Sequence, residues 1–199
     1  MTPLRGTRNA ARRTIRTTND SNNPNDSNDP NDPNDPNDYP LMAFRIRRAT
    51  VDDAPALGHL GALLLRVHHG FDPQRFMAPG RNPEAGYGSF LVSQLDDEDV
   101  AVFVADRDDV VVGYVYAALE PRSWKELREA CGVIHDVVVE EAGRRLGVAT
   151  ALIEAAAQWL KGRGAPRVVL GTAERNEAAQ RLFERLGFRR TMIEMTREL

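Results

Sequence analysis

The amino-acid sequence predicts an α/β (α+β) fold in which a mixed central β-sheet is flanked by helices and preceded by a disordered tail. Three observations support this prediction. Strand-like and helix-like patterns alternate from residue 44 onward, two strand-like patterns lie close together around a tight turn, and 42% of the 199 residues are apolar. Alternating elements with one early hairpin favour a mixed sheet covered by helices, and the apolar share is enough for a sizeable core.

The first 41 residues differ in composition from the rest of the chain. They begin with scattered arginines and continue in Asn, Asp, Ser and Pro, with the triplet Asn-Asp-Pro repeated between 28 and 36. Such a segment buries too little apolar surface to offset its loss of conformational entropy. We therefore predict a disordered tail over 1–41 and one domain over 42–199. The arginines suit a nucleic-acid arm or a transit peptide less well than solvated surface charge. Because ordered patterning begins at Met42, that residue is a candidate biological start.

Composition and cysteine usage limit the function classes. The formal net charge of -3 gives no reason to expect a nucleic-acid partner. Cys131 is the single cysteine, so no internal disulfide can form and a reducing compartment is expected. No apolar run approaches the ~18 residues of a membrane span and no secretory signal pattern is present, which predicts a soluble cytoplasmic protein without a membrane partner. His59, His68 and His69 do not form a metal-binding pattern, so no metal is predicted.

The first half of the domain predicts one strand, two helices and a hairpin. Alternating apolar and basic side chains indicate the first strand, and Thr50 suits the N-cap of the helix that follows. Asp52 and Asp53 then lie where the helix dipole favours anions, and Gly70 and Pro73 end the helix. In chain order, the predicted elements are a strand over 44–49, a helix ending near 70, a weaker helix over 85–95, and strands over 100–106 and 110–119.

The second half predicts alternating helices and strands. Ser123 suits the N-cap of a short helix, β-branched residues indicate a strand, and apolar residues at helical spacing indicate the longer helices. Gly162 and Gly187 end two of these helices. In chain order, the predicted elements are a helix over 123–130, a strand over 133–139, a helix over 148–161, a strand over 167–170, a helix over 176–186 and a strand over 188–196.

The segment 134–150 carries the clearest chemical signal. It reads as an apolar strand, a short polar loop and the start of a helix, with Gly143, Gly147 and Ala149 in or just after the loop. Small residues let a ligand approach the backbone, and the first N–H groups of a helix are unpaired and lie at its positive end. The pattern therefore predicts an anion site suited to a diphosphate. It is neither a P-loop nor a dinucleotide fingerprint, since the residues that define those motifs are absent.

The same segment resembles the acyl-CoA-binding motif of the GNAT superfamily of N-acetyltransferases, Arg/Gln-x-x-Gly-x-Gly/Ala after an apolar strand. Arg144, Gly147 and Ala149 occupy its three defined places. A second stretch, from Asn176 to Phe188, is similar to the family's Asn-x-x-Ala-x-x-Phe/Tyr-x-x-x-Gly-Phe segment. The resemblance covers roughly residues 43–197, with both motifs in the family's order. It implies an acetyl-CoA-dependent enzyme that transfers an acetyl group directly to an amine.

The resemblance also implies which residues hold acetyl-CoA. The main chain of the strand would bind the pantetheine arm, the loop and helix start would bind the diphosphate, and an asparagine would lie near the cofactor arm. Asn176 suits a helix N-cap equally well. The implied cofactor-binding residues are Val137, Val138, Val139, Arg144, Arg145, Gly147, Val148, Ala149, Thr150, Asn176 and Phe183.

Acid–base residues are harder to assign. Phe183 stands where many family members have a general-acid tyrosine, and phenylalanine cannot donate a proton; Tyr114 and Tyr116 are possible substitutes. For the general base the candidates are Asp136, Glu120 and His135, with Asp136 and Glu120 ranked first. Strict strand alternation would place His135 on the same face as Val137 and point Asp136 to the opposite face.

Two function classes remain open from the sequence. The first is an N-acetyltransferase acting on a primary amine of a small molecule, protein or peptide; the second is a catalytically silent acyl-CoA-binding regulatory domain, favoured only by Phe183. The acceptor would be shaped by the first helices, the loop over 71–83 and the segment 120–130, which carry no recognisable code. A homodimer is possible by analogy with the family, and fold analogy does not identify the acceptor.

Overall fold

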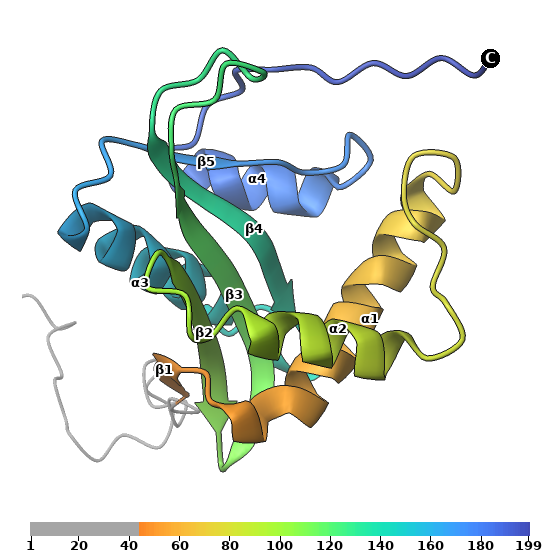
Figure 1. The fold of residues 1–199 in the computed structure, drawn as a ribbon. Helices are drawn as coiled ribbons and strands as arrows, with labels where there is room; N and C mark the ends of the chain where they lie inside the picture. The colour runs from red at the N-terminus through yellow and green to blue at the C-terminus, as the bar shows by residue number, and fades with distance from the viewer. Residues whose placement is uncertain (1–43) are drawn as a thin grey trace, which may run out of the picture. The chain divides into compact units, whose positions relative to one another are not determined.

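The computed structural model describes residues 44–199 (Figure 1). The predicted tail and the candidate start at Met42 lie outside the described residues. Five strands form one sheet in the order β1-β2-β3-β4-β5, antiparallel from β1 to β4 and parallel between β4 and β5. The strands are β1 (Arg45–Arg48), β2 (Val100–Arg107), β3 (Val110–Glu120), β4 (Cys131–Val139) and β5 (Val168–Leu170). The helices are α1 (Ala54–Phe71), α2 (Pro83–Ser93), α3 (Val148–Gly162) and α4 (Glu177–Arg185), with 3-10 turns η1 (Val51–Asp53) and η2 (Glu141–Gly143).

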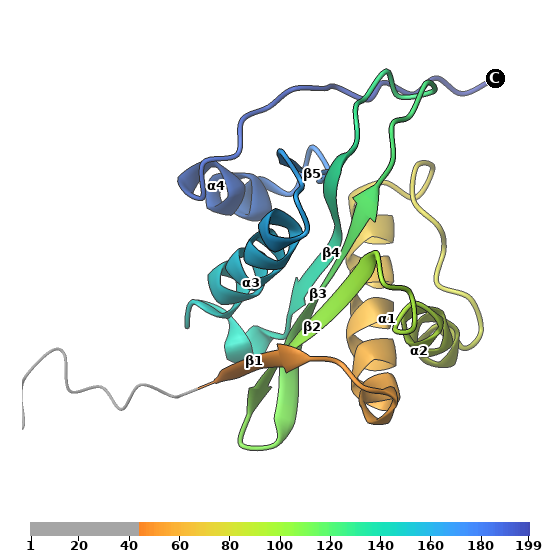
Figure 2. The same cartoon turned by 60° about the vertical axis from the view of Figure 1, so that its left-hand side comes forward.

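Helices cover both faces of the sheet, α1 and α2 on one face and α3 and α4 on the other (Figure 2). The two cores meet at the central strands. Tyr114 belongs to the cluster that contains Leu57 and Leu91 of the α1/α2 face, whereas Val115 belongs to the cluster that contains Leu152 of the α3/α4 face. Neighbouring strand residues point to opposite faces, and both faces of β3 are therefore buried. The predicted mixed sheet flanked by helices is confirmed.

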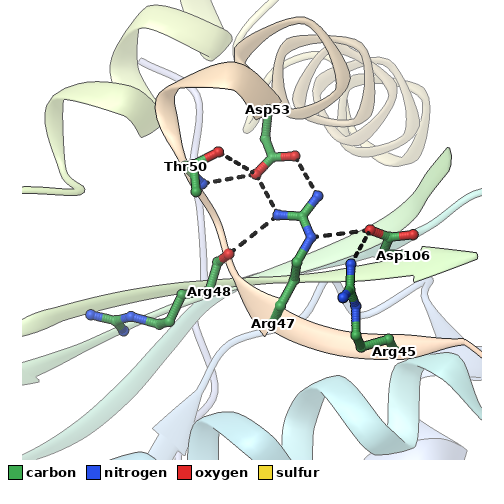
Figure 3. A network of polar contacts seen from close by, with 6 residues as sticks. All are labelled: Arg45, Arg47, Arg48, Thr50, Asp53 and Asp106. Carbon is green, nitrogen blue, oxygen red and sulfur yellow. Dashed lines mark hydrogen bonds and ion pairs between the residues drawn. The ribbon is translucent and has the colours of Figure 1, made fainter. Parts of the chain in front are cut away.

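A polar network fixes β1 to β2 and to the start of α1 (Figure 3). Arg47 donates two hydrogen bonds to Asp53, at 2.7 and 2.8 Å, and a third to Asp106 at 3.1 Å. Arg45 also donates to Asp106, and the Thr50 N–H donates to Asp53 at 2.8 Å. Arg47 is the main cause of the lowered pKa of both carboxyls. The predicted cap at Thr50 is thus present as a capping box that the Arg47 guanidinium reinforces.

Three glycines bring α1 and α2 unusually close together. A Cβ at Gly88 would lie 2.7 Å from the carbonyl oxygen of Ala54, and one at Gly58 would lie 2.2 Å from the carbonyl oxygen of Glu84. A Cβ at Gly61 would lie 2.1 Å from the ring of Tyr87. Side chains at these positions would separate the helices, so the spacing of α1 and α2 depends on glycine.

The predicted helix over 123–130 is wrong. Ser123 and Arg128 instead form an antiparallel bridge, with backbone hydrogen bonds of 2.8 and 3.0 Å in both directions. Leu127 has a φ of +51°, a value that does not occur in a right-handed helix. Trp124 and Leu127 are 80% and 88% exposed, so the segment has no buried face to hold a helix against the domain.

The predicted last strand over 188–196 is also wrong. The segment pairs with no strand among residues 44–199, and the described sheet ends at β5. The side chains of Met192, Ile193 and Met195 are more than 80% exposed. Its side chains are anchored by ion pairs of Glu194 with Arg75 and of Arg190 with Glu184. The alternating pattern was correct for an extended chain, but a strand also needs a partner for its backbone groups.

Candidate active site

The loop between β4 and α3 has a backbone shape that few side chains tolerate. After η2, Arg145 has a φ of +62° and Gly147, the N-cap of α3, has a φ of +80°. Both values lie in the left-handed region, which favours glycine. Val148 is 2% exposed and anchors the first residue of α3 in the α3/α4 core. The loop is therefore held by packing on the helix side while its turn faces outward.

This turn presents a run of unpaired backbone N–H groups. Gly143 and Arg144 donate to the carbonyls of Glu140 and Glu141, and Ala151 donates to the carbonyl of Gly147. Within the described part of the chain, the N–H groups of residues 145–150 have no backbone or side-chain acceptor outside the helix. The side chains from Arg144 to Gly147 are exposed, so none of them plugs the turn.

Charge around this turn favours an anion. The unpaired N–H groups lie at the N-terminus of α3, a helix of 15 residues whose dipole is positive at that end. Arg144 and Arg145 are exposed beside it, and Arg144 Nε donates to the carbonyl oxygen of Val139 at 3.3 Å. The sequence-predicted residues Gly147, Val148, Ala149 and Thr150 all lie in this turn or in the first turn of α3. Together they form a set of donors suited to a diphosphate.

Beside the turn, the sheet opens between β4 and β5. The two strands pair from Gly132–Val168 to Ile134–Leu170, and no pair follows in the described structure. The Glu140 N–H donates to Val112 on β3, and the Val138 carbonyl also lies toward β3. Because backbone groups alternate along a strand, the main-chain groups of Val137 and Val139 point away from β3 and toward the opening. This free strand edge leads directly into the turn.

Asn176 and Phe183 lie on α4 and have structural partners. The Asn176 side chain accepts a hydrogen bond from the Ala179 N–H at 3.2 Å, which makes Asn176 the N-cap of α4. Phe183 is 7% exposed and packs edge-on against Phe188 with ring centroids 5.9 Å apart. A contact of either residue with a cofactor stays a prediction.

On the other face of the sheet, a β-bulge brings His135 and Asp136 together. Tyr116 pairs with Asp136 and Ala117 pairs with Ile134, so His135 is an extra residue between two pairs. The predicted opposite orientation of His135 and Asp136 is wrong. His135 stacks on Tyr116 with ring centroids 4.8 Å apart, and Asp136 contacts tyrosines of the same α1/α2 face. A bulge interrupts the strand alternation on which the expectation relied.

Among the residues that the structure describes, the hydrogen-bond partners of Asp136 are two tyrosines. The hydroxyls of Tyr87 and Tyr114 donate to its Oδ2 at 2.7 and 3.0 Å. Burial raises the pKa of the Asp136 carboxyl, and the two hydrogen bonds oppose this rise without cancelling it. Burial and the charge of Asp136 in turn raise the pKa of Tyr87. The raised pKa makes the Asp136 carboxylate a stronger proton acceptor than an ordinary aspartate.

Glu120 and His135 form a neighbouring polar cluster. Glu120 accepts from Arg128, and its other oxygen lies 3.3 Å from Nε2 of His135. Arg128 also donates to the buried Sγ of Cys131 at 2.7 Å. The structure thus brings Glu120 and His135 into contact, with Asp136 next to His135 in β4 and Glu120 already engaged by a guanidinium.

Sequence reasoning missed Tyr87. Its position on α2 carried no motif, and the only signal available was an aromatic residue among small ones in a helix. In the structure it begins a row of aromatic rings, with Phe90 5.7 Å from Tyr87, Tyr116 5.9 Å from Phe90, and His135 stacked on Tyr116. This row lines the sheet face next to Asp136.

Other features of the described residues lie apart from this arrangement. Surface hollows occur along α4 around Glu177 and between α1 and α2 around Gly88, and the turn before α3 lines neither. His59 pairs with Glu140 at 2.7 Å. Residues 44–199 contain no cluster of three or more metal-binding side chains. None of the described helices combines the length and apolarity needed to cross a membrane.

A mixed sheet that opens beside a helix start rich in free N–H groups is an arrangement suited to an extended ligand with an anionic part. Residues 66–188 match the family described as "Acetyltransferase (GNAT) family", and the chain belongs to that family. The resemblance noted in the sequence is therefore confirmed.

Curated relatives carry acetyltransferase names. An N-alpha-acetyltransferase of Sulfurisphaera tokodaii is 33% identical over 52% of this chain and 65% of its own length. An uncharacterized N-acetyltransferase of Methanocaldococcus jannaschii is 30% identical over 74% of this chain and 62% of its own length. The chain thus spans less than two thirds of the length of these first relatives.

Solved structures share the fold. A tetramutant of a Bacillus halodurans protein has a TM-score of 0.67 at 23% identity, covering 78% of this chain and 99% of that one. An aminoglycoside N-acetyltransferase in complex with CoA has a TM-score of 0.60 at 18% identity, covering 79% of this chain and 95% of that one. At these identities the likeness concerns the fold alone.

Proposed function

We propose that the protein transfers an acetyl group from acetyl-CoA directly to a primary amine of a small molecule, protein or peptide. The observation that carries this proposal is the run of free N–H groups over 145–150 beside the open edge of β4. Family membership supports the reaction class, and the CoA complex of an aminoglycoside N-acetyltransferase with the same fold supports the co-substrate.

The chain's own groups suit the diphosphate and the pantetheine arm of acetyl-CoA. The N–H groups of residues 145–150 would bind the diphosphate, with Arg144 and Arg145 adding positive charge and the Thr150 hydroxyl a further donor. The main chain from Val137 to Val139 would bind the pantetheine arm along the open strand edge. The Asn176 amide and the Phe183 ring would border the arm from α4.

The chemical step follows from these positions. When bound, acetyl-CoA supplies an activated thioester carbonyl. The Val137 N–H would stabilise the charge that develops on the carbonyl oxygen. An alkyl ammonium has a pKa near 10 and no lone pair, so a base must first take its proton. Asp136 suits this role best, because its pKa is raised and its hydrogen-bond partners among residues 44–199 are neutral tyrosines. Glu120 and His135 are the alternatives.

The leaving group of the reaction, the CoA thiolate, also has to be accommodated by the site. The new C–N bond forms as the C–S bond breaks, and the leaving thiolate needs a proton or a positive environment. Phe183 donates no proton, so water or the N-terminal end of α3 would serve the thiolate. The other candidates for the acid, Tyr114 and Tyr116, have their hydroxyls engaged in hydrogen bonds to Asp136 and Gln94, respectively.

The names of relatives suggest two acceptor types to test first. Several are N-alpha-acetyltransferases, including one from Saccharolobus solfataricus that is 28% identical over 75% of this chain. Peptide α-amines are therefore the first candidates, and polyamine and aminoglycoside amines are the second.

An acetyl-transfer assay tests the proposal. Purified protein is incubated with acetyl-CoA and a panel of peptide and small-molecule amines, and free thiol is measured. We expect amine-dependent release of CoA, and loss of CoA binding in an Arg144→Ala/Gly147→Ala double variant. Thermal stabilisation by CoA without turnover on any amine would favour the alternative, a catalytically silent acyl-CoA-binding regulatory domain.

A further inference from the structure

The two oxygens of the Asp136 carboxylate have different surroundings. Tyr87 and Tyr114 both donate to Oδ2, one from α2 and one from β3. Oδ1 has no hydrogen-bond partner among the described residues. Every fully buried side-chain oxygen in this part of the chain does have a partner, so Oδ1 is not fully buried. It therefore remains accessible from outside.

Two donors on one oxygen restrict the carboxylate more than one would. A single hydrogen bond leaves the carboxyl group free to turn about its last side-chain bond, whereas donors from two separate elements fix its plane. Tyr114 is fully buried and therefore cannot move without disturbing the α1/α2 core. The arrangement consequently holds Oδ1 in one direction.

Gly61 on α1 makes this arrangement possible. A Cβ at that position would lie 2.1 Å from Cδ1 and 2.4 Å from Cγ of Tyr87. These atoms lie near the base of the ring, so a small rotation of Tyr87 would not relieve the contact. An alanine at position 61 would push the ring, and with it the hydroxyl, away from Asp136.

We propose that Tyr87 and Tyr114 are positioning residues that hold Oδ2 of Asp136 and leave Oδ1 to take the proton of the acceptor ammonium, with Gly61 providing the space for Tyr87. The inference rests on the proposed acetyl transfer. It assigns roles to Tyr87 and Gly61 that the sequence motifs do not indicate, and it gives α1 and α2 a part in the chemistry as well as in packing.

Other ionisable groups also face Asp136. His68 of α1 and His135 of β4 lower the pKa of the Asp136 carboxyl when they carry charge, and Tyr116 of β3 lies nearby. The imidazole Nδ1 of His68 contacts the Leu64 carbonyl at 3.0 Å. These groups remain in place when the hydroxyl of Tyr87 is removed, so a change in that variant reports on the tyrosine.

The test compares pH profiles of kcat/KM for the wild type, Tyr87→Phe and Tyr116→Phe. Tyr116→Phe removes a hydroxyl from the same face that bonds to Gln94 and not to Asp136. Losing the Tyr87 hydrogen bond should raise the pKa of the base and move the acidic limb of Tyr87→Phe upward by about one pH unit. The acidic limb of Tyr116→Phe should coincide with that of the wild type. Calorimetry with CoA checks that each variant is folded.

A second pair of variants tests the space at α1. Gly61→Ala should reproduce the shift of Tyr87→Phe, whereas Gly86→Ala, where an added Cβ meets nothing within 4 Å, should not. The inference is overturned if the wild type is active but the acidic limb of Tyr87→Phe coincides with that of the wild type. It is also overturned if the acidic limb of Tyr116→Phe moves as far as that of Tyr87→Phe. A wild type that transfers no acetyl group to any amine would instead overturn the proposed function itself.

Discussion

Replacing Ala149 with proline removes one backbone N–H from the start of α3 and little else. Ala149 is the second residue of that helix, where an N–H has no partner within the helix. Proline is tolerated in the first turn of a helix. The chain already contains an example, because Pro55 is the second residue of α1 and the preceding Ala54 keeps helical backbone angles, with φ -49° and ψ -43°. The Ala149→Pro variant is therefore expected to fold.

The expected loss of affinity follows from one donor. A hydrogen bond to a charged group contributes about 1.5–3 kcal/mol, which corresponds to a Kd for CoA about 10- to 150-fold weaker in Ala149→Pro. Calorimetric titration with CoA measures this Kd, and thermal unfolding without ligand checks that stability is retained. Ala149→Gly serves as the control, because it changes the side chain but keeps the N–H. A folded Ala149→Pro variant that binds CoA as tightly as Ala149→Gly would refute the assignment of this N–H to the ligand.

Three further predictions concern stability. Arg47 lowers the pKa of the Asp106 carboxyl, so the ionised carboxylate stabilises the fold above the unfolded-state pKa near 3.9, and this stability is lost as the pH falls through the lower folded-state pKa. Below about pH 4, Asp106→Asn should therefore lose less stability than the wild type in thermal melts. Identical pH dependence of the two proteins would contradict this prediction. Gly88→Ala should lose about 1–3 kcal/mol in urea unfolding, because its Cβ would meet the Ala54 carbonyl at 2.7 Å, and unchanged stability would mean that α2 can shift freely. Leu152→Ala should lose about 2–5 kcal/mol by leaving a cavity in the α3/α4 core, and a loss below about 1 kcal/mol would show that the core collapses around it.

The elements that the sequence predicted well are those whose signal is local. Alternation marked β1 and β4, a tight turn between apolar runs marked β2 and β3, helical spacing marked α1 and α3, and glycines marked the turn before α3. The turn could be located because its small residues and the following helix start are contiguous in the chain. The same contiguity explains why Thr50 was correctly placed as a cap.

The features that the sequence did not predict depend on partners distant in the chain. The bulge at His135 depends on how β4 aligns with β3, and Tyr87 reaches Asp136 from a helix 49 residues earlier. The mistaken strand over 188–196 had a suitable pattern but pairs with neither edge strand of the described sheet. The mistaken helix over 123–130 had a capping serine but no apolar face that could be buried. Tertiary contact decides each of these cases.

Binding of CoA at the turn before α3 can be tested by titrating the isotope-labelled protein with CoA and following its backbone amide resonances. We expect the amides of residues 145–150 to shift most, since their N–H groups acquire an anionic acceptor, and the amides of Val137 and Val139 to shift with them. If CoA binds and leaves the amides of 145–150 unmoved while others respond, the ligand does not lie at this turn.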